Sequence, residues 1–92
     1  MVKFKFNIGD QVRLKKGNTI HTVVKREITI WKAELTNNDD DLGYVTFKEK
    51  DITPELEEKL VNKSYSIGYR IQSTIGKGKR QNVSERMICK VN

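Results

Sequence analysis

The alternation of apolar and polar residues along much of this chain predicts β-strands with one buried face. Residues 65–72 alternate most regularly, and residues 2–8 show the same period of two. After a bend at residues 9–10, the alternation resumes over residues 11–14. The turn at residues 16–18 contains a glycine and an asparagine, which tolerate positive φ. We therefore expect short strands joined by tight turns.

The middle of the chain predicts a long hairpin. Residues 19–30 are rich in β-branched side chains and predict one long strand, or two strands with a bend, which residues 31–35 extend. Residues 37–41 are consecutive Asn and Asp, which favour a loop because neighbouring carboxylates repel each other. Residues 42–47 are expected to form the return strand.

One short helix is predicted after this hairpin. Thr53 is a suitable N-cap and Pro54 a suitable first helical residue. Glutamates follow in the first turns, where the positive end of the helix dipole stabilises negative charge. Leu56, Leu60 and Val61 share one face, which either caps an open end of the fold or docks a partner protein.

The C-terminal part predicts a second hairpin and a last strand. Residues 73–79 form a basic hairpin tip and residues 80–83 return. Residues 84–87 fit one helical or 3₁₀ turn, before a short strand at 88–91. The pattern therefore predicts a small, mostly β, antiparallel barrel, because closing the sheet removes edges that so small a chain cannot cover.

Two stretches carry motifs of a known kind of barrel. Residues 6–24 begin with Phe-Asn-Ile-Gly-Asp-Gln-Val-Arg-Leu-Lys-Lys-Gly, and residues 69–91 contain Val-Ser-Glu-Arg-Met-Ile at a turn. They resemble the opening strand and the closing hairpin, turn and last strand of SH3-like small barrels of the KOW, tudor and YodC-like kind. The resemblance implies one SH3-like barrel domain over residues 1–92, with about 28–64 as an inserted β-hairpin and short α-helix. It also implies binding of nucleic acid or protein tails, and it does not imply an enzyme.

The charge of the chain is unevenly distributed around a formal total of +6 over 92 residues. Residues 1–32 hold eight Lys or Arg and two acidic residues, and residues 63–92 hold seven and one, so each end has a net charge of +6. Residues 33–62 hold three and nine, a net charge of −6. This order predicts a dipolar surface or two basic segments joined in space.

Two basic turns are candidates for contact with phosphates. The segment 76–80, Gly-Lys-Gly-Lys-Arg, combines exposed backbone N–H groups with three cations, and residues 15–18 form the other basic turn. The alternative is that both are solvent-exposed turns that need glycine for geometry and charge for solubility. If they converge, they form one basic rim, the candidate nucleic-acid site: Lys15, Lys16, Arg70, Lys77, Lys79 and Arg80.

Few residues suit catalysis or metal binding. His21 and Cys89 are the single histidine and cysteine, so neither an internal disulfide nor a zinc site is expected, and no oxyanion motif accompanies them. We expect His21 to point outwards and Cys89 to be half-buried. The acidic run 39–41 lacks the spacing of a calcium loop, which favours a solvated tip over a cation site, a phosphate mimic or a surface that repels wrong partners. We predict no catalytic residue, metal, cofactor or small-molecule substrate.

Aromatic residues and apolar runs add two expectations. Trp31, the only tryptophan, is either a core residue or an exposed stacking platform, and we favour the core; Tyr44, Tyr65 and Tyr69 have the same alternatives. The apolar runs are too short for a membrane span, and residues 1–6 lack the apolar segment of a signal peptide. A lone cysteine suits a reducing, cytoplasmic environment.

Together, these features predict non-catalytic binding of nucleic acid, DNA or RNA, through the basic rim, with weak sequence readout. The alternative is a protein–protein interaction module that docks on a host or partner protein, and a weaker one is a small enzyme subunit or regulator. Small size and abundant Lys, Asn and Ile suit a phage or mobile-element accessory protein.

Overall fold

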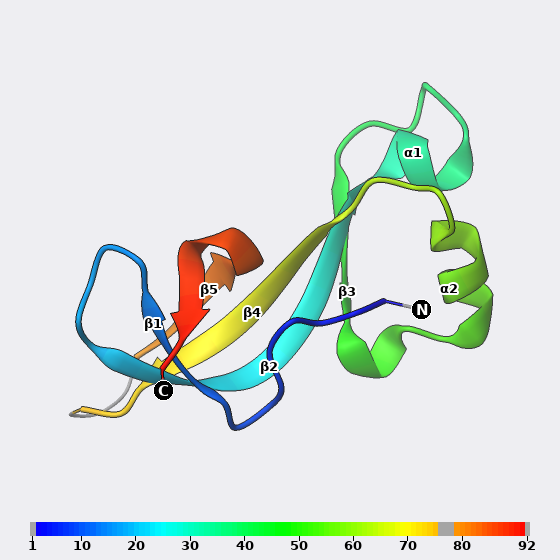
Figure 1. Ribbon diagram of the computed structural model, residues 1–92. Helices are drawn as coiled ribbons and strands as arrows, with labels where there is room; N and C mark the ends of the chain where they lie inside the picture. Colours follow the sequence, from blue (N-terminus) through cyan, green and yellow to red (C-terminus); the bar gives the residue numbers. More distant parts are fainter. Residues whose placement is uncertain (1, 76–78, 92) are drawn as a thin grey trace.

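The computed structural model describes residues 2–75 and 79–91, and within them the chain forms one antiparallel sheet of six strands (Figure 1). The molecule is elongated, with extents of 44 × 24 × 20 Å. The expectation of a mostly β, antiparallel protein with a hairpin and a short helix is therefore confirmed. The strands are β1 (Gln11–Leu14), β2 (Ile20–Trp31), β3 (Tyr44–Lys48), β4 (Ser66–Ser73), β5 (Arg80–Ser84) and β6 (Ile88–Lys90).

The long strand β2 organises the sheet. The strand order is β5-β4-β2-β1-β6, and β3 lies off this path as a second partner of β2. The first part of β2 pairs with β1, with Val12 opposite His21. Its last part pairs with β3, from Glu27 opposite Lys48 to Trp31 opposite Tyr44. Strand β4 pairs along the other edge of β2, so β2 and β4 run through both halves of the molecule (Figure 1).

The expected closure into a barrel is wrong, because β5 and β6 end the strand order and do not pair with each other within the described residues. The N-terminal segment occupies the concave side of the sheet instead, with Phe6 only 1% exposed. The backbone amides of this segment bond to side chains: Lys5 to Glu85, Phe6 to Tyr69 and Asn7 to Asp10. The predicted strand at residues 2–8 is therefore not formed.

A β-bulge in β2 changes which residues face the core. The register with β4 shifts between Val23 and Lys25. Before the bulge, His21 and Val23 are buried; after it, Ile28 and Ile30 are buried. The predicted long strand is thus continuous but bent, and its buried positions change parity at the bulge.

Two hydrophobic clusters fill the concave side. The first lies under the part of the sheet that contains β1, β5 and β6, and it consists of Phe6, Val12, Val23, Tyr69, Ile71, Val83 and Ile88. The second forms where the last part of β2 and the hairpin strand β3 pack on a helix, and its buried residues are Ile28, Ile30 and Leu60. Phe4 and Ile67 contact both clusters, so the two halves share one continuous apolar interior.

The helical elements lie mostly in the predicted insertion. Helix α2 (Pro54–Leu60) begins as expected, since the Thr53 side chain accepts a hydrogen bond from the Leu56 amide at 3.2 Å. Val61 is 61% exposed and so does not belong to its buried face. Helix α1 (Lys32–Thr36) replaces the expected extension of β2. The 3₁₀ turns are η1 (Glu49–Asp51) and η2 (Glu85–Met87), the second at the predicted position.

Candidate nucleic-acid interface

The convex side of the sheet, here called the outer face, carries a row of polar side chains. Ile28 and Ile30 point to the core, so Lys25 and Trp31, which have the opposite parity in β2, point outwards. Residues directly opposite in an antiparallel pair lie on the same side of the sheet. Lys25 therefore shares the outer face with its partner Arg70, and Trp31 shares it with Tyr44.

Cations from several strands gather at one part of the outer face. Arg70 of β4 is opposite Lys25, and Arg80 of β5 is opposite Gln72, the next outward residue of β4. The pKa of Lys25 is lowered below its usual range, first by the charge of Lys48 and then by that of Arg70, with smaller effects of its own desolvation, Arg80 and Lys50. These four charges therefore lie close enough to Lys25 to repel its ammonium group. Together with Lys25, we call them the basic cluster: Lys25, Lys48, Lys50, Arg70 and Arg80.

The two arginines of the basic cluster are held by neighbouring amides. Arg70 donates from Nε to Asn82 Oδ1 at 3.1 Å, and Arg80 donates from Nε to Gln72 Oε1 at 3.3 Å. Both bonds use the Nε donor and so orient the guanidinium group. Neither bond uses the Nη donors. Neutral amide partners leave the charge of the cluster intact.

An aromatic pair lies further along the outer face. The rings of Trp31 and Tyr44 meet edge to face with centroids 4.8 Å apart. Trp31 is 38% exposed and Tyr44 is 69% exposed. The placement of Trp31 in the core is therefore wrong, since its parity in β2 turns it away from the buried Ile30. Tyr69 is fully buried and Tyr65 is half-buried in the second cluster, as the core alternative predicts.

A shallow depression separates the basic cluster from the aromatic pair. It has a volume of about 230 Å³, and outward residues such as Thr29, Ser66 and Asn82 line it together with Glu27. Gly68 lies opposite Glu27 in β2 and Ser84 in β5, and its lack of a side chain keeps the surface low. The depression therefore offers hydroxyl and amide groups beside one carboxylate.

The structure brings together only part of the predicted rim. Arg70 and Arg80 lie on the outer face, and the exposed Lys79 directly precedes β5. Lys15 lies elsewhere: its amide donates to the Met87 carbonyl, and its side chain lines another hollow with Glu85 and Arg86 of η2. Lys16 is exposed in the same β1–β2 turn, whereas Lys77 lies outside the described residues.

The sequence does not single out Lys25, Lys48 and Lys50, because they lie on strands and in a 3₁₀ turn outside the glycine-containing basic turns. The pairing of β2 with β3 places Lys48 opposite Glu27, two residues from Lys25, so the register of this hairpin is the signal that could have linked these two lysines.

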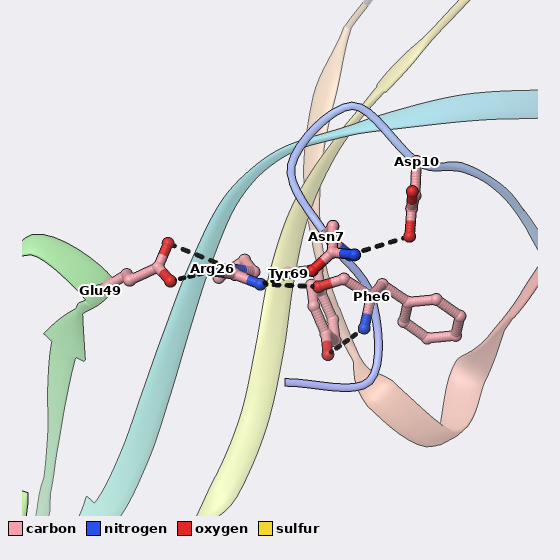
Figure 2. Close-up of polar contacts among 6 residues, drawn as sticks. All are labelled: Phe6, Asn7, Asp10, Arg26, Glu49 and Tyr69. Carbon is pink, nitrogen blue, oxygen red and sulfur yellow. Dashed lines mark hydrogen bonds and ion pairs between the residues drawn. The ribbon is translucent and has the colours of Figure 1, made fainter. Parts of the chain in front are cut away.

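The remaining cation of β2, Arg26, faces inwards and is neutralised. Its guanidinium forms an ion pair with Glu49, and its Nη1 donates to the Phe6 carbonyl at 3.1 Å (Figure 2). It also lies over the Phe4 ring, 4.5 Å from the centroid. Arg26 thus fastens the N-terminal segment and adds no charge to the outer face.

Tyr69 holds the same segment from β4. Its hydroxyl accepts a bond from the Phe6 amide at 3.2 Å (Figure 2) and donates to the Glu85 carboxylate. Burial, aided by the bond to Glu85, raises the pKa of Tyr69 to about 12. The hydroxyl is therefore a structural clamp between the N-terminal segment, β4 and η2.

The other candidate residues have structural surroundings. His21 is buried, contrary to the expectation that it points outwards, because the parity before the bulge turns it to the core. Cys89 is half-buried as expected. In the acidic loop, Asp41 accepts a bond from the Thr36 hydroxyl at 2.7 Å. Over residues 2–75 and 79–91, no three His, Cys, Asp or Glu residues are grouped as metal ligands would be, and no helix has the length and hydropathy to cross a membrane.

Comparison with known proteins adds no relative from which a function could be carried over. No family model, curated protein or solved structure matches this chain.

Proposed function

We propose that this chain is a non-catalytic nucleic-acid-binding protein that contacts phosphates through the basic cluster on the outer face. The observation that carries the proposal is the gathering of like charges from β2, β3, β4 and β5 on one surface. Such a gathering costs folding free energy through repulsion, and a polyanion relieves that cost. The formal net charge of +6 also favours binding of a polyanion.

The strand order supports an SH3-like ancestry for this binding surface. Without β3, the order is β5-β4-β2-β1-β6, with the 3₁₀ turn η2 directly before the last strand. This arrangement is similar to that of SH3-like small barrels, here opened and extended by the arm that contains β3 and α2. We propose that Lys25 of β2, Lys48 of β3 and Lys50 of η1 join the arginines of β4 and β5 in this surface.

Fluorescence anisotropy with labelled DNA and RNA, single- and double-stranded, tests the proposal. The double variant Lys25→Gln/Arg70→Gln removes two charges from the basic cluster. The control variant Lys59→Gln/Arg86→Gln removes the same charge from exposed positions in α2 and η2. We expect the first variant to bind at least tenfold more weakly and the control to bind nearly as wild type. Equal affinity of the two variants would mean that only net charge matters and would refute the assigned site.

A second candidate function is docking on a protein partner. It is favoured by the exposure of large apolar side chains near the end of β2, namely Trp31, Leu42 and Tyr44. Protein docking depends on such apolar anchors and a defined stoichiometry, whereas phosphate binding weakens steeply with salt. Binding of a partner that Tyr44→Ala abolishes and that salt barely affects would favour this function.

A further inference from the structure

We propose that the outer face binds single-stranded nucleic acid, with unpaired bases stacking on Trp31 and Tyr44 while the basic cluster holds the phosphates of the same strand. This inference rests on the proposed function and specifies its substrate class.

The first support is that the β-strand β2 contributes a residue to each part of the site. Lys25 and Trp31 are outward residues of β2, six positions apart, so about 20 Å separates them along the strand. Single-strand-binding surfaces combine a positively charged track for the backbone with aromatic side chains for the bases. The rigid sheet fixes the spacing between these two parts.

The second support is the exposure and geometry of the aromatic pair. Trp31 and Tyr44 remain 38% and 69% exposed although both could bury more area by packing inwards. Their edge-to-face contact, with an interplanar angle of 71°, leaves at least one ring with both faces uncovered by its partner. A planar base can stack on such a face whatever its identity.

The third support is the surface between the two parts. The Thr29 and Thr46 hydroxyls bond to each other at 2.8 Å, and Gly68 leaves the depression open. Short polar side chains here present donors and acceptors to sugars and base edges without blocking the path of the strand. Glu27 is the one carboxylate lining the depression, and its cross-strand partner is Lys48.

These features favour a single strand over a duplex. In a duplex the bases are paired and stacked on one another, so they cannot stack on side chains. Reading a duplex groove requires a protruding element such as a helix or a ribbon. The outer face is formed by paired strands and offers its aromatic rings on the surface of the sheet.

The test uses the full chain and two probes of equal length, an oligothymidylate of about 12 nucleotides and a mixed-sequence duplex. Because Trp31 is the only tryptophan, its fluorescence reports stacking directly. We expect the oligothymidylate to quench this fluorescence and to bind at least about tenfold more tightly than the duplex.

Three variants complete the design. Tyr44→Ala is expected to weaken oligothymidylate binding about tenfold without changing duplex binding, while Trp31→Phe retains most of the affinity because a ring remains. Leu42→Ala, at a nearby residue that is 71% exposed, is the matched non-aromatic control. Thermal unfolding of each variant checks that the fold is retained.

The outcomes separate this inference from the proposed function. Salt-sensitive binding without quenching, equal for both probes and unaffected by Tyr44→Ala, would overturn the single-strand inference and leave the phosphate-binding function standing. Absence of binding to either probe, even at low salt, would overturn both. Capture of a protein through the aromatic pair, with no quenching by oligothymidylate, would overturn the inference in favour of protein docking.

Discussion

Lys25 of β2 and Arg70 of β4 are direct cross-strand partners whose like charges meet on the outer face of the sheet. Like charges in this arrangement destabilise a sheet. Arg70 is bonded to the neutral Asn82, so the local contact does not cancel the repulsion. The pair is therefore expected to cost stability, and an anion bound there would relieve that cost.

This relationship predicts opposite effects of one substitution on stability and binding. Lys25→Gln removes the repulsion with Arg70 and Lys48, so the midpoint of urea unfolding should rise. The same change should weaken binding to labelled single-stranded DNA. A lower midpoint together with unchanged affinity would show that Lys25 is a structural residue.

A second prediction concerns the proton affinity of Lys25. Lys48 is the largest cause of the lowered pKa of Lys25, so Lys48→Gln should raise that pKa towards its ordinary value of 10.5. Bound phosphate should act in the same direction, because negative charge favours the protonated amine. NMR titration of the Lys25 side chain in both proteins measures the change. An unchanged pKa would mean that the two lysines are farther apart than the cluster requires.

A third prediction concerns the Tyr69 clamp. Tyr69→Phe leaves the buried Phe6 amide without its acceptor and should cost about 1–3 kcal/mol in the free energy of unfolding, measured with urea. The pKa of Tyr69 is about 12 in the folded protein, against an ordinary value of 10.0, so folding favours the neutral phenol. The stability that the neutral Tyr69 phenol contributes is therefore complete below pH 10 and is lost as the pH rises towards 12. The phenylalanine variant should lack this alkaline loss, and an identical alkaline loss would contradict the clamp.

A fourth prediction compares two ion pairs. Arg26–Glu49 is part-buried and tied to the N-terminal segment, so Glu49→Gln should lower the free energy of unfolding by about 1.5–3 kcal/mol. In the second pair, Lys90 Nζ lies 3.9 Å from Asp10 Oδ2 and the lysine is exposed. Lys90→Gln should therefore change the free energy of unfolding by about 0.5 kcal/mol or less. Urea unfolding measures both variants. Equal losses would show that the Arg26 contact does not fasten the segment.

Local sequence rules predicted the elements whose structure depends on near neighbours. The alternation of residues 65–72, the Thr53 cap and the turn before the last strand are found where the sequence predicts them. Residues 2–8 show the same period of two, but the Lys5 and Phe6 amides bond to the side chains of Glu85 and Tyr69. That outcome depends on contacts distant in sequence, which periodicity does not contain.

The site was predicted only in part for a related reason. Arg70 and Arg80 were identified from basic segments near the C-terminal hairpin. The outward positions of Lys25 and Trp31 depend on the bulge at Val23–Lys25, which reverses the parity of β2. A one-residue shift moves every later side chain to the other face, so alternation alone could not assign them.

The most direct measurement is the salt dependence of single-stranded DNA affinity for wild type and Lys25→Gln/Arg70→Gln. If both side chains contact phosphates, the slope of log affinity against log salt should become shallower by about 1.4, since each contact contributes about 0.7. The Lys59→Gln/Arg86→Gln control should keep the wild-type slope. Identical slopes for all three proteins would contradict the claim that the basic cluster is the phosphate-binding site.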